Sequence, residues 1–130
     1  MSMLTKEQKE FFNTANIGHL ATINEDGTPQ VTPVWVDVEG DQILVNTAEG
    51  RNKVKNIRRD PRVSVEVVDR QDPYKSVSVK GHVVEMKKQG ADEHIDSLAK
   101  KYLGQDRYPF RQPGEERIIL RIEPEKVLAA

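Results

Sequence analysis

Val45–Val63, VNTAEGRNKVKNIRRDPRV, is the stretch of this sequence that indicates most about the fold. It predicts the end of a strand, a tight turn, a short basic helix and the start of another strand. Gly50 permits the turn because glycine tolerates backbone conformations that other residues avoid. Pro61 ends the helix, since proline cannot continue it and also disfavours helical geometry at Asp60 before it.

The predicted helix carries a concentrated positive charge. Six of the twenty Lys and Arg residues of the chain lie in this stretch: Arg51, Lys53, Lys55, Arg58, Arg59 and Arg62. Arg51 and Lys53 stand at the helix start, where free N–H groups and the positive end of the helix dipole also favour an anion. The pattern predicts either a phosphate site or an ordinary solvated helix that packs Val54 and Ile57 beneath it.

The composition restricts the class of protein. With 130 residues, the chain is expected to form one domain, residues 1–130. The formal net charge is −1, so the basic helix is a local patch and no general affinity for nucleic acid is expected. The absence of cysteine excludes disulfides and thiolate metal sites. Neither a signal-peptide pattern nor a membrane-spanning apolar run is visible, which predicts a soluble, cytoplasmic protein without membrane contact.

Strands and short turns fill most of the remaining sequence. Thr5 and Gln8 form a capping-box pattern that predicts a helix over residues 5–15, and apolar spacing predicts another over 90–103, ended by Gly104. Strands are predicted at residues 17–23, 30–38, 42–46, 62–68, 75–86 and 117–122, the last with a possible extension beyond Pro124. Gly81 indicates a bulge or a bend. Six antiparallel strands with two or three helices predict a mainly β protein, an all-β barrel.

The strand predicted over residues 30–38 carries more apolar side chains than one face of a barrel would bury. Val31, Val34, Trp35 and Val36 lie close together on it. An apolar face that the barrel does not use fully is suited to self-association, which predicts a homodimer.

These elements, in this order, resemble the flavin-binding split-barrel superfamily, the pyridoxamine-phosphate-oxidase-like proteins. Within it the chain is most similar to the small deazaflavin (coenzyme F420)-dependent oxidoreductases. The resemblance covers essentially the whole chain. It rests on residues 18–35, 45–53, 56–63 and 80–83, and on the C-terminal motifs at 102–104 and 108–111. It implies a six-stranded antiparallel split β-barrel with short flanking helices, and a homodimer that holds two cofactors between its subunits.

The resemblance also implies a set of cofactor-binding residues. Pro33, Val34, Trp35 and Val36 would line the ring, and Asn46 and Thr47 would hydrogen-bond the linker on the phosphate side. Arg51, Asn52 and Lys53 would meet the phosphate, while Lys55, Arg58 and Arg59 would face the polyglutamate tail of F420. Ser76 completes the set. Asn52 stands where pyridoxamine phosphate oxidases have an arginine, which favours F420 over FMN. The substrate-binding C-terminal segment of those oxidases has no counterpart here, so oxidation of vitamin B6 is not expected.

The activity implied is hydride transfer between F420 and a small conjugated organic substrate, with the proton drawn from solvent. Two alternatives remain open: an FMN-dependent oxidoreductase of the same fold, or a non-catalytic carrier or sensor of a flavin, deazaflavin or haem. Fold alone does not decide between them.

Several other residues have both a functional and a structural interpretation. His19, His82 and His94 do not form a metal-ligand pattern, and His94 is expected to face solvent. Tyr108 and Phe110 could form a lid over the ring or plug the barrel. Arg111 and Arg117 could meet an acidic substrate, but exposure at the surface is the simpler expectation for both.

Overall fold

The computed structural model describes residues 3–129, which form seven strands and three helices. The helices are α1 (Lys6–Asn13), α2 (Asn52–Arg59) and α3 (Ala91–Leu103). The strands are β1 (Gly18–Ile23), β2 (Pro29–Val34), β3 (Val36–Glu39), β4 (Gln42–Ala48), β5 (Arg62–Val68), β6 (Ser76–Lys87) and β7 (Arg117–Ala129). None of the helices within residues 3–129 is long and apolar enough to cross a membrane.

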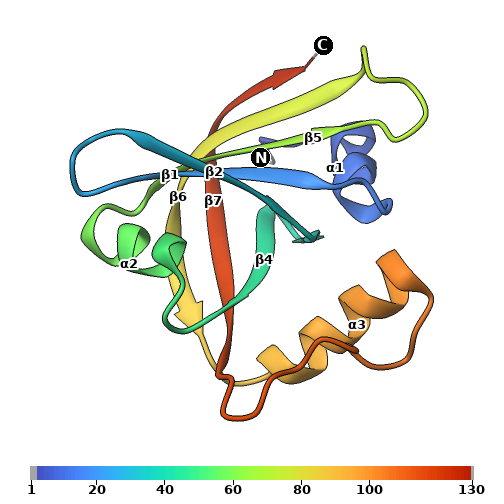
Figure 1. Ribbon diagram of the computed structural model, residues 1–130. Helices are drawn as coiled ribbons and strands as arrows, with labels where there is room; N and C mark the ends of the chain where they lie inside the picture. The colour runs from blue at the N-terminus through green and yellow to red at the C-terminus, as the bar shows by residue number, and fades with distance from the viewer. Residues whose placement is uncertain (1–2, 130) are drawn as a thin grey trace.

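The strands form one antiparallel sheet in the order β2-β1-β5-β6-β7-β4-β3. β2 and β3 stand at opposite ends of this order, yet only Trp35 separates them in sequence. A flat sheet of this order would place them roughly 29 Å apart, six spacings of about 4.8 Å each. The sheet must therefore curl until its two edges approach each other at Trp35, and Figure 1 shows this half-barrel.

The number of strands corrects the sequence-based prediction of six. The single strand predicted over residues 30–38 is divided at Trp35 into β2 and β3. Residues before Trp35 pair with β1, whereas residues after it pair with β4. The change of partner turns the chain from one edge of the sheet to the other, and it places Trp35 at the rim between them.

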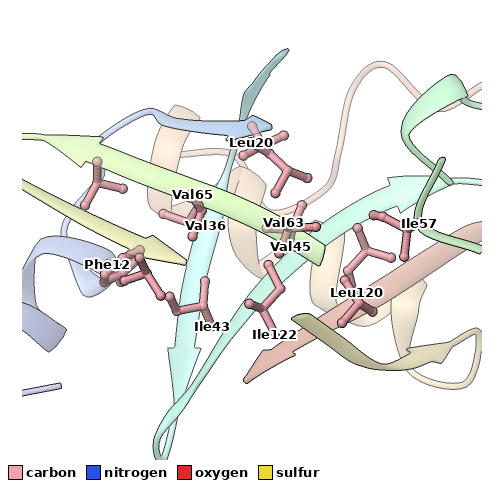
Figure 2. Packing of buried hydrophobic residues seen from close by; sticks show 14 of the residues in the cluster. Phe12, Leu20, Val36, Ile43, Val45, Ile57, Val63, Val65, Leu120 and Ile122 are labelled. Atoms are coloured by element: carbon pink, nitrogen blue, oxygen red, sulfur yellow. The ribbon is translucent and has the colours of Figure 1, made fainter. Parts of the chain in front are cut away.

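Side chains from most of the strands and two of the helices fill the interior of the curled sheet. Figure 2 shows Leu20, Val36, Val45, Val65 and Leu120 packing into a common core. Alternate residues of β1, β5 and β6 are buried, as expected for strands with one face on a core. β4 differs, because Ile43 to Ala48 are all buried. Its second face packs against α3, where the buried Asn46 side chain donates to the Ala91 carbonyl.

The predicted irregularity at Gly81 is confirmed. The register between β6 and β7 shifts between Lys80 and Gly81, which places Gly81 opposite Pro124. A Cβ atom on Gly81 would stand 2.1 Å from the carbonyl oxygen of Glu123. Because the bulge accommodates the proline, β7 continues from Arg117 to Ala129, so the extension predicted beyond Pro124 is confirmed.

The C-terminal end of α3 ties the rim to the N-terminal segment. The Lys101 ammonium donates to the carbonyl oxygens of Val36 (2.6 Å) and Phe12. The Tyr102 hydroxyl accepts a hydrogen bond from the Val36 N–H (3.0 Å) and donates to the Asn16 carbonyl (2.6 Å). These bonds satisfy the backbone beside Trp35, where the chain leaves one edge of the sheet and joins the other.

Candidate functional site

A cavity of about 290 Å³ opens at the rim of the half-barrel. It brings together elements that are distant in sequence: β2, the residue after it, β4, α2, α3, β7 and the loop before β7. Its lining consists of Ile17, Pro33, Val34, Trp35, Asn46, Thr47, Arg51, Lys53, Ile95, Tyr108, Phe110 and Arg117.

Three cations define one side of the cavity. Arg51 occupies the N-cap position of α2, Lys53 follows in the first turn, and Arg117 begins β7. None of the ion pairs formed within residues 3–129 includes Arg51 or Lys53. Burial lowers the pKa of the Lys53 amine, and the positive charges of Arg51 and Arg117 lower it further. Like charges held this close favour binding of an anion, which would relieve their repulsion.

Aromatic side chains form a second wall. Trp35 stacks on Tyr102, with ring centroids 5.2 Å apart and planes only 6° from parallel. Trp35 and Tyr108 meet nearly at right angles with ring centroids 5.9 Å apart, and Tyr108 meets Phe110 in the same way at 5.7 Å. Contacts on two sides therefore hold the indole in one orientation. Such a surface can pack against a flat ring.

Asn56 anchors the basic helix to the sheet. Its side chain is buried beneath α2, where the amide nitrogen lies within hydrogen-bond distance of Thr22, Asn24 and Gln30 on the β1–β2 hairpin. Its carbonyl oxygen accepts a bond from Arg59. The amide thereby fixes α2, and with it Lys53 one turn earlier, against the β1–β2 hairpin.

Replacing Asn56 with alanine is expected to lower the free energy of unfolding by about 2–3 kcal/mol, because buried polar partners lose their bonds. Asn52→Ala is the matched control: Asn52 is exposed on the same helix, so its loss should cost less than about 0.5 kcal/mol. Urea unfolding of both variants gives the comparison, and equal losses would show that the Asn56 network adds no stability.

The cavity contains seven of the residues predicted for the cofactor site: Pro33, Val34, Trp35, Asn46, Thr47, Arg51 and Lys53. Six others lie outside its lining, among them Arg59, which donates to the Ile23 carbonyl and to the Asn56 side chain. Val36 is fully buried in the core, and Asn52 and Lys55 are exposed on α2. Arg58 is ion-paired with Glu49, and Ser76 lines a separate hollow beside Thr5 and Phe11.

The prediction that Arg117 lies exposed at the surface is wrong. Only 5% of its side chain is exposed, and it donates to Asn46 (Nε to Oδ1, 2.9 Å) and to Glu115 (2.8 Å). Its guanidinium also lies 5.1 Å from the centre of the Tyr108 ring. Arg111, by contrast, is exposed as predicted and pairs with Asp92 and Asp96 on α3.

The prediction that His94 faces solvent is also wrong. Its side chain is only 10% exposed, because α3 turns it toward β3 and β4. Nδ1 lies 3.1 Å from the Asn46 amide nitrogen, and Nε2 lies 3.4 Å from a carboxylate oxygen of Asp37 without the alignment of a hydrogen bond. Within residues 3–129 no group of three or more His, Asp or Glu side chains is arranged to hold a metal ion.

A curled antiparallel sheet with a cationic, aromatic-walled cavity at its rim defines the class of split-barrel proteins that bind flavin-type cofactors. A model of the family described as pyridoxamine 5′-phosphate oxidase matches residues 4–129. The chain therefore belongs to this family of flavin-binding oxidoreductases.

Solved structures support the same assignment. The chain is similar to an F420 reductase, with 26% identity and a TM-score of 0.83 over 96% of this chain and 98% of that one. It is also similar to a conserved hypothetical protein of Mycobacterium tuberculosis, at 27% identity and TM-score 0.75 over 98% and 85% of the two chains. A putative pyridoxamine 5′-phosphate oxidase of Lactobacillus delbrueckii aligns at 25% identity and TM-score 0.67, covering 96% and 93%.

Proposed function

We propose that this chain is an F420-dependent oxidoreductase that transfers a hydride between the deazaflavin and a small conjugated organic substrate. The observation that carries the proposal is the convergence, in one cavity, of the α2 cations with the residues predicted to line the ring. Arg51 and Lys53 would hold the phosphate, while Pro33, Val34 and Trp35 would face the ring.

The residues fit such a cofactor chemically. Burial lowers the pKa of Lys53 most, and repulsion from Arg51 and Arg117 lowers it further; an anionic phosphate would relieve that repulsion. The apolar and aromatic wall matches a planar ring. The volume of about 290 Å³ lies just below the range of about 300–1,000 Å³ for small-molecule sites. The cavity would therefore enclose part of the cofactor, and the remainder would extend along the surface.

When bound, the deazaflavin supplies the hydride chemistry. The task of the protein is to bind and orient it. Lys53 and Arg51 would fix one end through charge-assisted hydrogen bonds. Trp35, held by Tyr102 and Tyr108, would fix the ring plane and exclude water from one face. No side chain is assigned as a proton donor, so the proton would come from solvent.

The similarity to an F420 reductase along 96% of this chain supports F420 over FMN. Asn52, in place of the arginine of the oxidases, supports the same choice. Lys55 is exposed on α2 and would meet the polyglutamate tail. Arg58 contributes less, because Glu49 already neutralises its charge.

The remaining parts of the proposal concern assembly and location. Val31 on β2 is 60% exposed, and Ile17 and Phe110 beside the cavity are 43% and 59% exposed. A second copy of the chain packed on this face would bury these apolar side chains and cover the part of the cofactor that the cavity leaves open. We place the resulting homodimer in the cytoplasm.

The test is a fluorescence titration of the purified protein with F420 and, separately, with FMN. We expect the wild type to bind F420 more tightly. Lys53→Ala should weaken binding by about 10- to 100-fold, which corresponds to the loss of a charge-assisted hydrogen bond. Lys87→Ala removes the same charge from an exposed position at the end of β6, and it should leave the affinity unchanged.

Each other outcome has a distinct meaning. Preference for FMN would assign the chain to flavin-dependent oxidoreductases. Tight F420 binding without reduction of any electron-poor acceptor would favour a carrier or sensor. Binding of neither cofactor would contradict the proposal.

A further inference from the structure

A line of half-buried and buried polar side chains runs from β3, past α3, to the cavity. It begins at Asp37 on β3, passes through His94 on α3 and Asn46 on β4, and ends at Arg117 on β7. Buried polar groups are costly unless they are bonded to one another, so a connected series of this kind restricts its members to few arrangements.

The Asn46 amide has only one orientation that satisfies its neighbours. Its nitrogen donates to the Ala91 carbonyl (2.9 Å) and lies 3.1 Å from Nδ1 of His94. Its oxygen is therefore directed at Arg117, where it accepts from Nε at 2.9 Å. If the amide were reversed, its NH₂ group would face the Arg117 N–H, donor against donor. Its oxygen would then face the Ala91 carbonyl, acceptor against acceptor. The neighbours on α3 thus decide which atom Arg117 meets.

His94 completes this orientation. Because Nδ1 faces the amide nitrogen of Asn46, the hydrogen-bond pattern assigns Nδ1 as the acceptor and places the ring proton on Nε2, toward Asp37. Burial raises the pKa of Asp37, but its contacts with His94, the Val38 N–H and Lys101 outweigh burial and lower the pKa below its usual value. Asp37 therefore stays a carboxylate, and it favours the tautomer of His94 that supports Asn46.

The guanidinium of Arg117 is left with donors for a ligand. Asn46 and Glu115 take Nε and Nη1, whereas Nη2 has no hydrogen-bond partner among the described residues. Arg117 lines the cavity on the same cationic side as Lys53. After burial and Arg51, its positive charge also lowers the pKa of Lys53. An anion held by Lys53 is therefore within the electrostatic reach of Arg117.

We propose that Arg117 is a ligand-binding residue that donates from Nη2 to a phosphate oxygen shared with Lys53, and that Asn46 and His94 are its positioning residues. The proposal rests on the proposed function in one respect, that the cavity receives the phosphate of a cofactor. The carboxylate of Glu115, 2.8 Å from Arg117, balances the charge of the guanidinium. Arg117 would therefore contribute a directed hydrogen bond to the phosphate more than net positive charge. It would select ligands with a phosphate over those without one.

The experiment compares FMN, riboflavin and inorganic phosphate as probes of the wild type and of variants. Arg117→Lys keeps the charge but loses the planar fork, so FMN affinity should fall about tenfold while riboflavin affinity stays within about twofold. The matched control is Arg121→Lys. Arg121 lies on the same strand but pairs with Glu39 and Glu85 outside the cavity, so this change should affect neither ligand.

A double-mutant cycle tests the positioning role. His94→Phe should weaken the binding of FMN and of inorganic phosphate about three- to tenfold in the wild type, but not once Arg117 is lysine. A general effect on folding would weaken both backgrounds equally. His82→Phe, at a partly exposed histidine paired with Glu125, serves as the control for the histidine change.

The outcomes separate this inference from the proposed function. Unchanged FMN and phosphate affinity in folded Arg117→Lys would overturn the inference and leave the proposed function standing. Equal losses for FMN and riboflavin would also overturn it, because the contact would then be with the ring. If the wild type binds phosphate through Arg117 but neither F420 nor FMN, the inference stands and the proposed function fails. If the wild type binds F420 but neither FMN nor inorganic phosphate, the inference fails and the proposed function stands. Failure to bind F420 as well contradicts both.

Discussion

Gly81→Ala is expected to lower the free energy of unfolding by about 3 kcal/mol or more, a large part of the roughly 5–15 kcal/mol typical of a small protein. The added methyl would stand 2.1 Å from the Glu123 carbonyl oxygen, 3.0 Å from its carbon and 3.3 Å from Cα of Pro124. All three are backbone atoms, so no side-chain rotation can relieve the overlap. β6 and β7 would have to separate at the bulge that lets β7 continue past Pro124.

Urea unfolding of Gly81→Ala beside Gly27→Ala distinguishes this clash from simple backbone strain. Gly27 has a φ of +86° in the β1–β2 turn, and no atom lies within 4 Å of the position of its Cβ. Its replacement should cost about 1 kcal/mol through conformation alone. If the Gly81 variant loses no more stability than the Gly27 variant, the close approach of the two strands is not a constraint on the fold.

The features predicted correctly from the sequence are those that depend on neighbouring residues. The turn at Gly50, the helix over Asn52–Arg59 and its end before Pro61 follow from local conformational rules, and all three are present. Thr5 and Gln8 likewise form the predicted capping box. The grouping of Lys53 with Trp35 came from the family resemblance, since nothing local in the sequence relates residues on these two separate elements.

The features that sequence reasoning missed depend on contacts between distant elements. Residues 30–38 contain no signal that divides the strand at Trp35, because the division arises from a change of pairing partner. Arg117 and His94 were assigned to the surface by residue type. One signal could have found them: the apolar stripe of α3 must cover a sheet face, and polar residues beneath that cover must bond one another.

The burial of the Asn56 side chain beneath α2 also could not be predicted from neighbouring residues. Asn56 follows Lys55 in a polar stretch, and its burial depends on acceptors from the β1–β2 hairpin more than twenty-five residues earlier. A basic helix with a buried asparagine is fixed more firmly than a solvated helix. This arrangement favours the interpretation of the segment as a binding element.

The affinity of the wild type for an anionic cofactor is expected to fall steeply as the pH rises above the pKa of Lys53. The substitution Lys53→Arg should abolish most of this fall. In the ligand-free protein, burial and then the charges of Arg51 and Arg117 lower the pKa of Lys53 below 10.5. The anion binds the protonated amine, so it raises that pKa again. Affinity is therefore greatest below the lowered pKa, and it decreases by up to about tenfold per pH unit above it.

An arginine at this position stays protonated throughout the accessible range, so its binding curve should be nearly flat with pH. Calorimetric titrations of wild type and Lys53→Arg with the same cofactor cancel the ligand's own ionisation. Repeating them in buffers of different ionisation enthalpy measures the proton taken up on binding, which should appear only in the wild type above the lowered pKa. Equal pH slopes in the two proteins would place the anion away from Lys53, because a lysine that does not touch the ligand cannot couple its proton to binding.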